Sequence, residues 1–123
     1  MITRRVCFVG CFLFLISAHL HAQGVSIIEY QNVQLARSLA AVVYDPGHFP
    51  MAGVLVEEFS PDWEKSLRST RTDAAGGFTF APVKGRAVYY LQLRMEGFNP
   101  LRVRVKVDPK RGKDLQLKMV LST

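Results

Sequence analysis

The sequence has few of the residues that carry out chemistry. Its 123 residues include 2 cysteines and 3 histidines. Both cysteines, Cys7 and Cys11, lie in an N-terminal segment that we expect to be removed, so the remaining chain has no thiol for a disulfide or a metal. His48 is the only histidine beyond position 21, and a zinc or iron site needs three or four ligands. We therefore expect no metal, no cofactor and no thiol chemistry.

No hydrophobic run is long enough to form a membrane-spanning helix. The run at residues 6–16 has about half of the ~20 apolar residues that a bilayer requires. Arg4 and Arg5 precede it, and a stretch of small and mixed residues follows it up to Ala22. This layout is typical of a secretory signal peptide, so we predict cleavage after Ala22 and export to the periplasm or the medium. An uncleaved membrane anchor is the alternative.

The charge is only mildly positive. Lysine and arginine number 16 against 10 acidic residues, a net charge of +6, and removal of Arg4 and Arg5 would leave +4. This excess permits an acidic partner or an anionic surface, but it does not argue for nucleic acid. No serine is accompanied by a histidine base and an acid at positions that would form a catalytic triad. The sequence therefore predicts a protein that is not an enzyme.

What the sequence does contain is a repeated alternation of apolar and polar residues. It is clearest at residues 101–107, where leucine and valine alternate with arginine and lysine. Turn residues recur roughly every 8–12 positions, and no long helix is indicated. These features predict an all-β protein, an antiparallel sandwich of seven or eight strands whose sheets each have one buried and one exposed face. The expected strands are residues 24–30, 35–44, 54–59, 67–72, 77–80, 87–95, 101–107 and 115–121.

The rest of the chain is organised around residues 70–80. We predict a hairpin here, in which residues 67–72 pair with residues 77–80 across a glycine-containing turn. Phe78 and Phe80 are separated by one residue, so they point to the same side of a strand. We expect both rings to be buried in the core.

The sequence predicts the structure of three turns. Asp73 is expected to accept hydrogen bonds from the amides of its own turn, and Gly76 and Gly77 to supply positive φ angles. Calcium is not expected there, because alanine follows where a second oxygen ligand would be needed. The sequence Asp-Pro-Gly-His at residues 45–48 suits a type II turn with its positive φ at the glycine. Residues 60–64 suit the first turn of a helix.

Two points of the strand pattern stay open at this stage. For residues 54–59, the alternation is compatible with Val54 and Val56 facing the core, or with Leu55 and Phe59 facing it. The pairing of the first strand is also open, because residues 24–30 could pair with their own chain or with another.

Three segments carry a family resemblance. Residues 39–56 contain an Asp-Pro-Gly turn, residues 70–80 contain Thr-Asp-x-x-Gly-x-Phe, and residues 90–98 end in Gly-Phe. Together they resemble carboxypeptidase regulatory-like domains over residues 38–121. The resemblance implies a transthyretin-like Greek-key sandwich of seven strands. The domains it suggests are a signal peptide (1–22), an N-terminal strand or linker (23–37) and the sandwich (38–123). The positions that depart from the family pattern are Ala41, His48 and Ala52.

The resemblance also carries an expectation about function. Domains of this family are usually non-enzymatic appendages or stand-alone exported modules, and some relatives bind carbohydrate. Related hydrolases need a histidine and arginine cluster and a Tyr-Arg-Gly-Ser ending, whereas this sequence ends in Val-Leu-Ser-Thr. We expect an exported module that mediates protein–protein interaction or has a structural role at the cell envelope, with carbohydrate binding as the alternative.

The first candidate for a binding site is a basic sheet face. If the apolar residues of 101–107 face inward, Arg102, Arg104 and Lys106 face outward. Cations beside a tyrosine would bind carboxylated or sulfated glycans or an acidic protein surface. The alternative is a solvated face whose charges prevent edge-to-edge pairing. If neighbouring strands share this face, its further members are Tyr90, Gln92, Arg94, Gln116 and Lys118.

The second candidate is Trp63, the only tryptophan of the chain. An exposed tryptophan in a loop of a sandwich would anchor a sugar or a protein. The alternative is a hydrophobic plug over an open end of the sandwich. Two coplanar exposed aromatic side chains would favour carbohydrate, and the sequence offers only one candidate. Protein binding is therefore the leading hypothesis.

Overall fold

The protein is all-β over residues 26–122, the part of the chain that the computed structural model describes. This range contains ten strands and no helix, which confirms the fold class that the alternation of apolar and polar residues predicted. The strands are β1 (Ile28–Glu29), β2 (Gln34–Tyr44), β3 (Leu55–Phe59), β4 (Ser66–Arg71), β5 (Gly77–Thr79), β6 (Val88–Arg94), β7 (Phe98–Asn99), β8 (Leu101–Val107), β9 (Lys113–Lys118) and β10 (Val120–Leu121).

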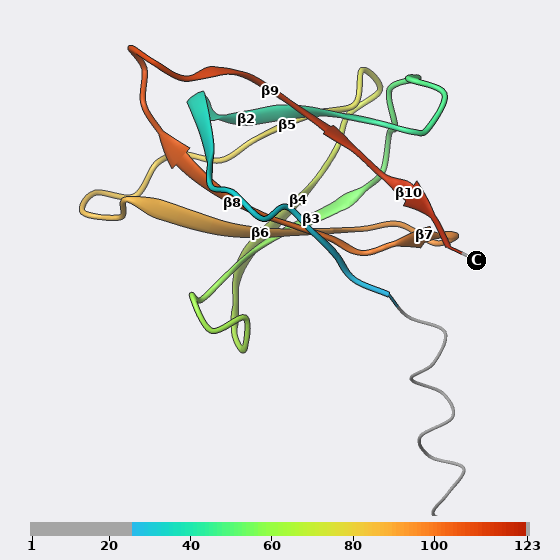
Figure 1. Cartoon of the computed structure of the whole chain (residues 1–123), viewed down its shortest axis with the longest axis horizontal. Coiled ribbons are helices and arrows are strands. Elements are labelled where there is room, and N and C mark those ends of the chain that lie inside the picture. The colour runs from blue at the N-terminus through green and yellow to red at the C-terminus, as the bar shows by residue number, and fades with distance from the viewer. Residues whose placement is uncertain (1–25, 123) are drawn as a thin grey trace, which may run out of the picture.

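Eight strands form one mixed sheet that folds over into two layers (Figure 1). The lower layer in Figure 1 has the order β4-β3-β6-β8. The upper layer contains β5 and β9, which both pair with β2. β2 belongs to both layers, because residues 34–36 pair with β8 and residues 40–44 pair with β5 or β9. A second, two-stranded sheet joins β7 to β10.

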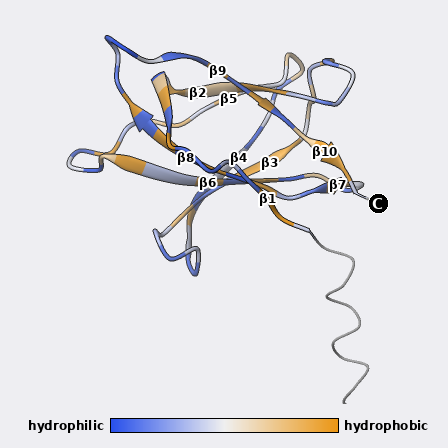
Figure 2. Cartoon of the chain, in the orientation of Figure 1, coloured by the Kyte–Doolittle hydropathy of each residue, from blue (hydrophilic) through white to orange (hydrophobic). Residues whose placement is uncertain are grey.

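The core lies between the two layers. Hydrophobic residues occur on strands of both layers, whereas the β3–β4 loop is largely hydrophilic (Figure 2). Val54 and Val56 are fully buried, so Leu55 and Phe59 point away from the core. Phe78 is buried and contacts the ring of another buried phenylalanine edge-to-face, with 6.1 Å between centroids. The fully buried apolar side chains include Leu39, Val43, Leu91, Leu93, Leu101, Val103, Val105, Leu117 and Met119.

The sheet is not purely antiparallel, and that prediction is wrong in part. β1 and β2 both run parallel to β8, and β9 runs parallel to β2. The remaining pairings are antiparallel. Alternation along a strand has the same period in both kinds of sheet, so the sequence pattern could not distinguish them.

The predicted central hairpin is also wrong, because its two strands belong to different layers. β4 pairs with β3, and β5 pairs with β2. The hydroxyl of Thr72, at the end of β4, donates to the carbonyl of Met51 at 2.6 Å and accepts the amide of Val54 at 2.9 Å. The amide of Val43 in β2 donates to the carbonyl of Gly76 at 2.8 Å. These bonds hold the two ends of the turn to separate layers.

The turn itself has the predicted cap. The Oδ1 atom of Asp73 accepts the amides of Ala75 and Gly77, both at 2.9 Å. Of the two glycines in this turn, only Gly76 has a positive φ, of 79°, so the prediction for Gly77 is wrong. A Cβ at Gly76 would lie 2.8 Å from the carbonyl oxygen of Val43. Glycine is therefore required at position 76 both for its φ angle and for the close approach of β2.

The turn at residues 45–48 differs from the predicted type II turn. Its positive φ, 67°, is at His48 and not at Gly47. The carboxylate of Asp45 accepts the amides of Gly47 and Phe49 at 2.8 and 2.9 Å, and the ring of His48 stacks on Tyr44 with 4.2 Å between centroids. These contacts stabilise the positive φ angle of His48, which the turn pattern had predicted for Gly47.

The first strand pairs with its own chain. Ile28 lies opposite Leu101 and Glu29 opposite Arg102, in parallel register. The predicted signal peptide and its cleavage site lie outside the described residues. Between residues 26 and 122 there is no helix of the length and apolarity needed to cross a membrane.

Candidate functional site

The outward side of the lower layer brings together seven of the nine residues that the sequence singled out for binding. In the antiparallel register of β6 and β8, Tyr90 lies opposite Arg104, and Gln92 lies opposite Arg102. Buried apolar residues alternate with these positions on both strands, so all four point away from the apolar core, although Gln92 is itself only 9% exposed. We call this surface the basic–aromatic face. Its residues are Phe59, Trp63, Tyr90, Gln92, Arg94, Arg102, Arg104 and Lys106.

Trp63 reaches this face from the β3–β4 loop. Its indole lies 6.0 Å from the ring of Phe59 and contacts Tyr90 edge-to-face at 5.5 Å, measured between centroids. The guanidinium carbon of Arg102 lies 4.5 Å from the indole centroid, which is a cation–π contact. Trp63 is therefore half-buried on the outer face of the sheet and does not cover an open end of the sandwich.

Hydrogen bonds within the loop fix the position of Trp63. The hydroxyl of Ser60 donates to Asp62 at 2.6 Å and accepts the amide of Lys65 at 3.0 Å. Asp62 also accepts the amide of Glu64 at 3.0 Å. Trp63 has a left-handed φ of 64°, which a right-handed helix does not allow. The helical turn predicted here is instead a tight turn that aims the indole at the sheet.

Acid is expected to loosen this loop and to change the fluorescence of Trp63. Hydrogen bonds from the Ser60 hydroxyl and the Glu64 amide hold the pKa of Asp62 below its ordinary value. A carboxyl group with a lowered pKa in the folded state contributes stability above its unfolded pKa, and this stability is lost as the pH falls through the folded pKa. We therefore expect the emission maximum of Trp63 to shift below about pH 4 in an acid titration.

The control for this titration is Asp62→Asn. An asparagine oxygen can still accept the two hydrogen bonds, but it carries no charge to lose. The variant should have the wild-type emission at neutral pH and should lack the acid step. An identical step in the variant would show that another group controls the loop.

The arginines of this face are held by specific partners. The Nε of Arg102 donates to Gln92 Oε1 at 2.8 Å, and Arg104 donates to the carbonyl of Gln31 at 2.5 Å. Arg94 forms an ion pair with Glu57 at 3.0 Å. Among the described residues, Arg102, Arg104 and Lys106 take part in no ion pair. The side chains of the two arginines are positioned by neutral partners, and although Glu29 of β1 lies opposite Arg102 in register, it forms no ion pair with it.

Lys118 and Gln116 do not join this face. Both belong to β9, where they lie opposite Tyr44 and Val42 of β2 in the upper layer. They are exposed, but on the other side of the molecule from β8. The alternation of apolar and polar residues predicts which side chains of a strand point outward, but not which strands are neighbours. It therefore could not show that Lys118 lies apart from the other cations.

A buried ion cluster inside the fold escaped the sequence analysis. Glu58 is 1% exposed, and its two oxygens bind Arg68 and Arg86, each at 2.6 Å. The guanidinium of Arg68 also lies 4.7 Å from the ring centroid of Phe80. The sequence contained one indication of its burial. Glu58 is separated from Val56, and Val56 from Val54, by one residue, so Glu58 faces inward with both valines. The cluster links β3 and β4 to the loop before β6, which identifies it as a structural feature.

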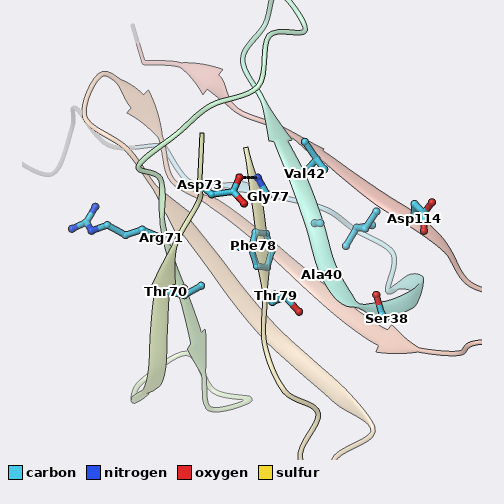
Figure 3. A pocket seen from close by; sticks show the side chains of 12 residues that line it. Ser38, Ala40, Val42, Thr70, Arg71, Asp73, Gly77, Phe78, Thr79 and Asp114 are labelled. Carbon is cyan, nitrogen blue, oxygen red and sulfur yellow. Dashed lines mark hydrogen bonds between the residues drawn. The ribbon is translucent and has the colours of Figure 1, made fainter. Parts of the chain in front are cut away.

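The upper layer carries an open groove of about 570 Å³ over β2 and β5 (Figure 3). Small residues line it, among them Ala40 and Thr79, and the carboxylates of Asp73 and Asp114 lie on opposite sides. Asp73 is already engaged by the amide of Gly77. Across residues 26–122, no three histidine, cysteine or acidic side chains gather in a way that could hold a metal ion. Thr70 and Arg71 of β4 also line this groove.

No protein-family model matches the chain, and a search of curated proteins gives no match either. The resemblance to carboxypeptidase regulatory-like domains therefore stays a prediction from the residues that carry it.

Proposed function

We propose that this protein is an exported, non-enzymatic module that binds an acidic surface of another protein at the cell envelope. The basic–aromatic face carries the proposal, because it places Arg102 and Arg104 beside the aromatic side chains of Trp63 and Tyr90. Arginine, tryptophan and tyrosine dominate the binding energy of protein interfaces. The resemblance to carboxypeptidase regulatory-like domains, with their transthyretin-like Greek-key sandwich, agrees with a module of this kind.

Carbohydrate binding is the second hypothesis, and the geometry around Trp63 favours it less. A sugar stacks on the open face of an aromatic ring, whereas Arg102 lies over the indole and two other rings contact it. Tyr90 contacts the indole edge-to-face, at an interplanar angle of 82°, so the two rings form no coplanar platform. A protein surface can use the same cluster without such a platform, through side chains that pack against its edges.

The proposal is tested by capturing partners with variants of the two layers. Tagged protein would be incubated with the envelope and exported fractions of the source cells. We expect a specific partner to be retained by the wild type and lost at least about 10-fold when Arg102→Gln and Arg104→Gln are combined, because uncompensated cations at an interface control association. Retention should also fall as salt rises.

The matched control combines Lys113→Gln and Lys118→Gln, which removes the same charge from the upper layer. This control should retain the partner as well as the wild type does. Equal loss in both double variants would show that only net charge matters, and retention by both would exclude the basic–aromatic face. Either result would contradict the proposal.

A further inference from the structure

We infer that the partner presents an extended segment with carboxylates at every second residue, and that this segment lies along β8. The inference rests on the proposed function and specifies the chemistry of the partner. Arg102, Arg104 and Lys106 are successive outward residues of one strand. They form a line of three positive charges, and none of them is paired with an acid among residues 26–122.

The spacing of these charges matches that of an extended chain. Outward residues of a strand are two positions apart, or about 6.6–6.8 Å. Acidic residues at positions i, i+2 and i+4 of an extended segment have the same spacing and all point to one side. Such a segment can place one carboxylate near each cation of β8. A block of three consecutive acids cannot, because the middle side chain points away.

The two arginines are prepared for this contact by neutral partners. Arg102 donates to the side-chain oxygen of Gln92, and Arg104 donates to the backbone carbonyl of Gln31. These bonds hold the guanidinium groups in place without cancelling their charge. Part of the side-chain entropy that binding would otherwise cost is therefore already lost in the free protein.

The aromatic cluster beside the line favours a protein over a sulfated polysaccharide. Tyr90 lies directly opposite Arg104, and the indole of Trp63 lies against Arg102. A polypeptide can place an apolar side chain on these rings next to its carboxylates. A sulfated polysaccharide carries the anions, but its sugar rings would need an open aromatic face, and Arg102 lies over the indole.

Peptides of equal composition test the inference. The first has three glutamates that alternate with threonine, and the second has the same three glutamates in one block; both are acetylated, amidated and labelled. Fluorescence anisotropy at low salt should show at least about 5-fold tighter binding of the alternating peptide, since displaced surface ion pairs each lose a modest contribution. A third peptide adds a leucine beside the alternating glutamates, to contact the aromatic cluster. Trp63→Ala should weaken the binding of this peptide.

A charge swap tests the register directly. Arg104→Glu should abolish the preference for the alternating peptide, and a peptide whose middle glutamate is lysine should restore binding to this variant. Lys106→Gln, at an exposed position, serves as a second variant if the change at Arg104 disturbs the fold. Lys118→Gln, on the upper layer, should leave the preference unchanged.

The outcomes separate the inference from the proposed function. Equal binding of both peptides would overturn the inference and leave the acidic-partner proposal standing. No binding of either peptide, together with no partner captured from the cell fractions, would overturn both. Tighter binding of chondroitin sulfate, unaffected by Trp63→Ala, would replace the protein partner by a polysaccharide.

Discussion

Replacing Glu58 by alanine is expected to lower the free energy of unfolding by about 3–5 kcal/mol. The carboxylate of Glu58 is buried and forms ion pairs with Arg68 and Arg86. Its removal would leave two partly buried guanidinium groups without their acceptor. A second nitrogen of Arg68 is buried without a hydrogen-bond partner already, so this arginine has no spare contact to compensate.

Denaturant unfolding followed by the fluorescence of Trp63 measures this loss. The matched control is Glu57→Ala on the same strand, which removes an outward carboxylate paired with the half-exposed Arg94 and should cost within about 1 kcal/mol. Glu58→Leu combined with Arg68→Leu should recover part of the loss, because an apolar pair replaces the Glu58–Arg68 ion pair and Arg86, 33% exposed, can turn to water. A loss below about 1 kcal/mol for Glu58→Ala would show that the cluster contributes little.

The sequence was a good guide to strands and faces and a poor guide to their neighbours. The strict alternation of residues 101–107 placed Arg102 and Arg104 outward correctly, because a period of two allows only two faces. The burial of Phe78 and Phe80 followed from the same rule. Pairing depends instead on contacts far apart in the chain, and no local pattern contains that information.

The central hairpin illustrates this limit. Two strand-like segments joined by a short glycine turn predict a hairpin on local grounds. Here the hydroxyl of Thr72 bonds residues next to β3, while Gly76 bonds β2. These long-range bonds decide that the turn crosses between layers. The turn cap at Asp73 was predictable because every atom it binds lies within four residues.

In the candidate site, too, local features were predicted and long-range neighbours were not. Its cations were identified from the sequence, but Lys118 was grouped with them although it lies in the other layer. Phe59 was missed, because the parity of residues 54–59 could not be decided without a partner strand. Glu58 was missed for the same reason, although once Val56 faces the core the glutamate two positions later must follow it.

Replacing Gly112 by alanine is the other change from which we expect a large loss, about 3 kcal/mol or more. Gly112 is buried in the turn between β8 and β9, and its amide donates to the carbonyl of Asp108 at 2.7 Å. A Cβ here would lie 2.5 Å from the amide nitrogen of Arg37 and closer still to the carbonyl group of Ala36. These are backbone atoms, so no side-chain rotation relieves the clash.

The position of Ala36 makes this clash costly. It is fully buried and pairs with both Val107 at the end of β8 and Lys113 at the start of β9. β2 passes from the lower to the upper layer next to this residue. Moving the turn away from Ala36 would also break the hydrogen bond from the amide of Asp108 to the Ala36 carbonyl, 2.8 Å long. The two layers would lose one of the connections between them, at the point where β2 crosses.

Thermal unfolding provides the measurement. A loss of about 3 kcal/mol corresponds to a decrease in Tm of roughly 12–24 °C for a domain of this size. The control is Gly85→Ala, where φ is 84° but the space around the new methyl is open, so it should cost about 1–2 kcal/mol from backbone strain alone. If Gly112→Ala costs no more than Gly85→Ala, the turn tolerates displacement and close packing against Ala36 does not hold the layers together.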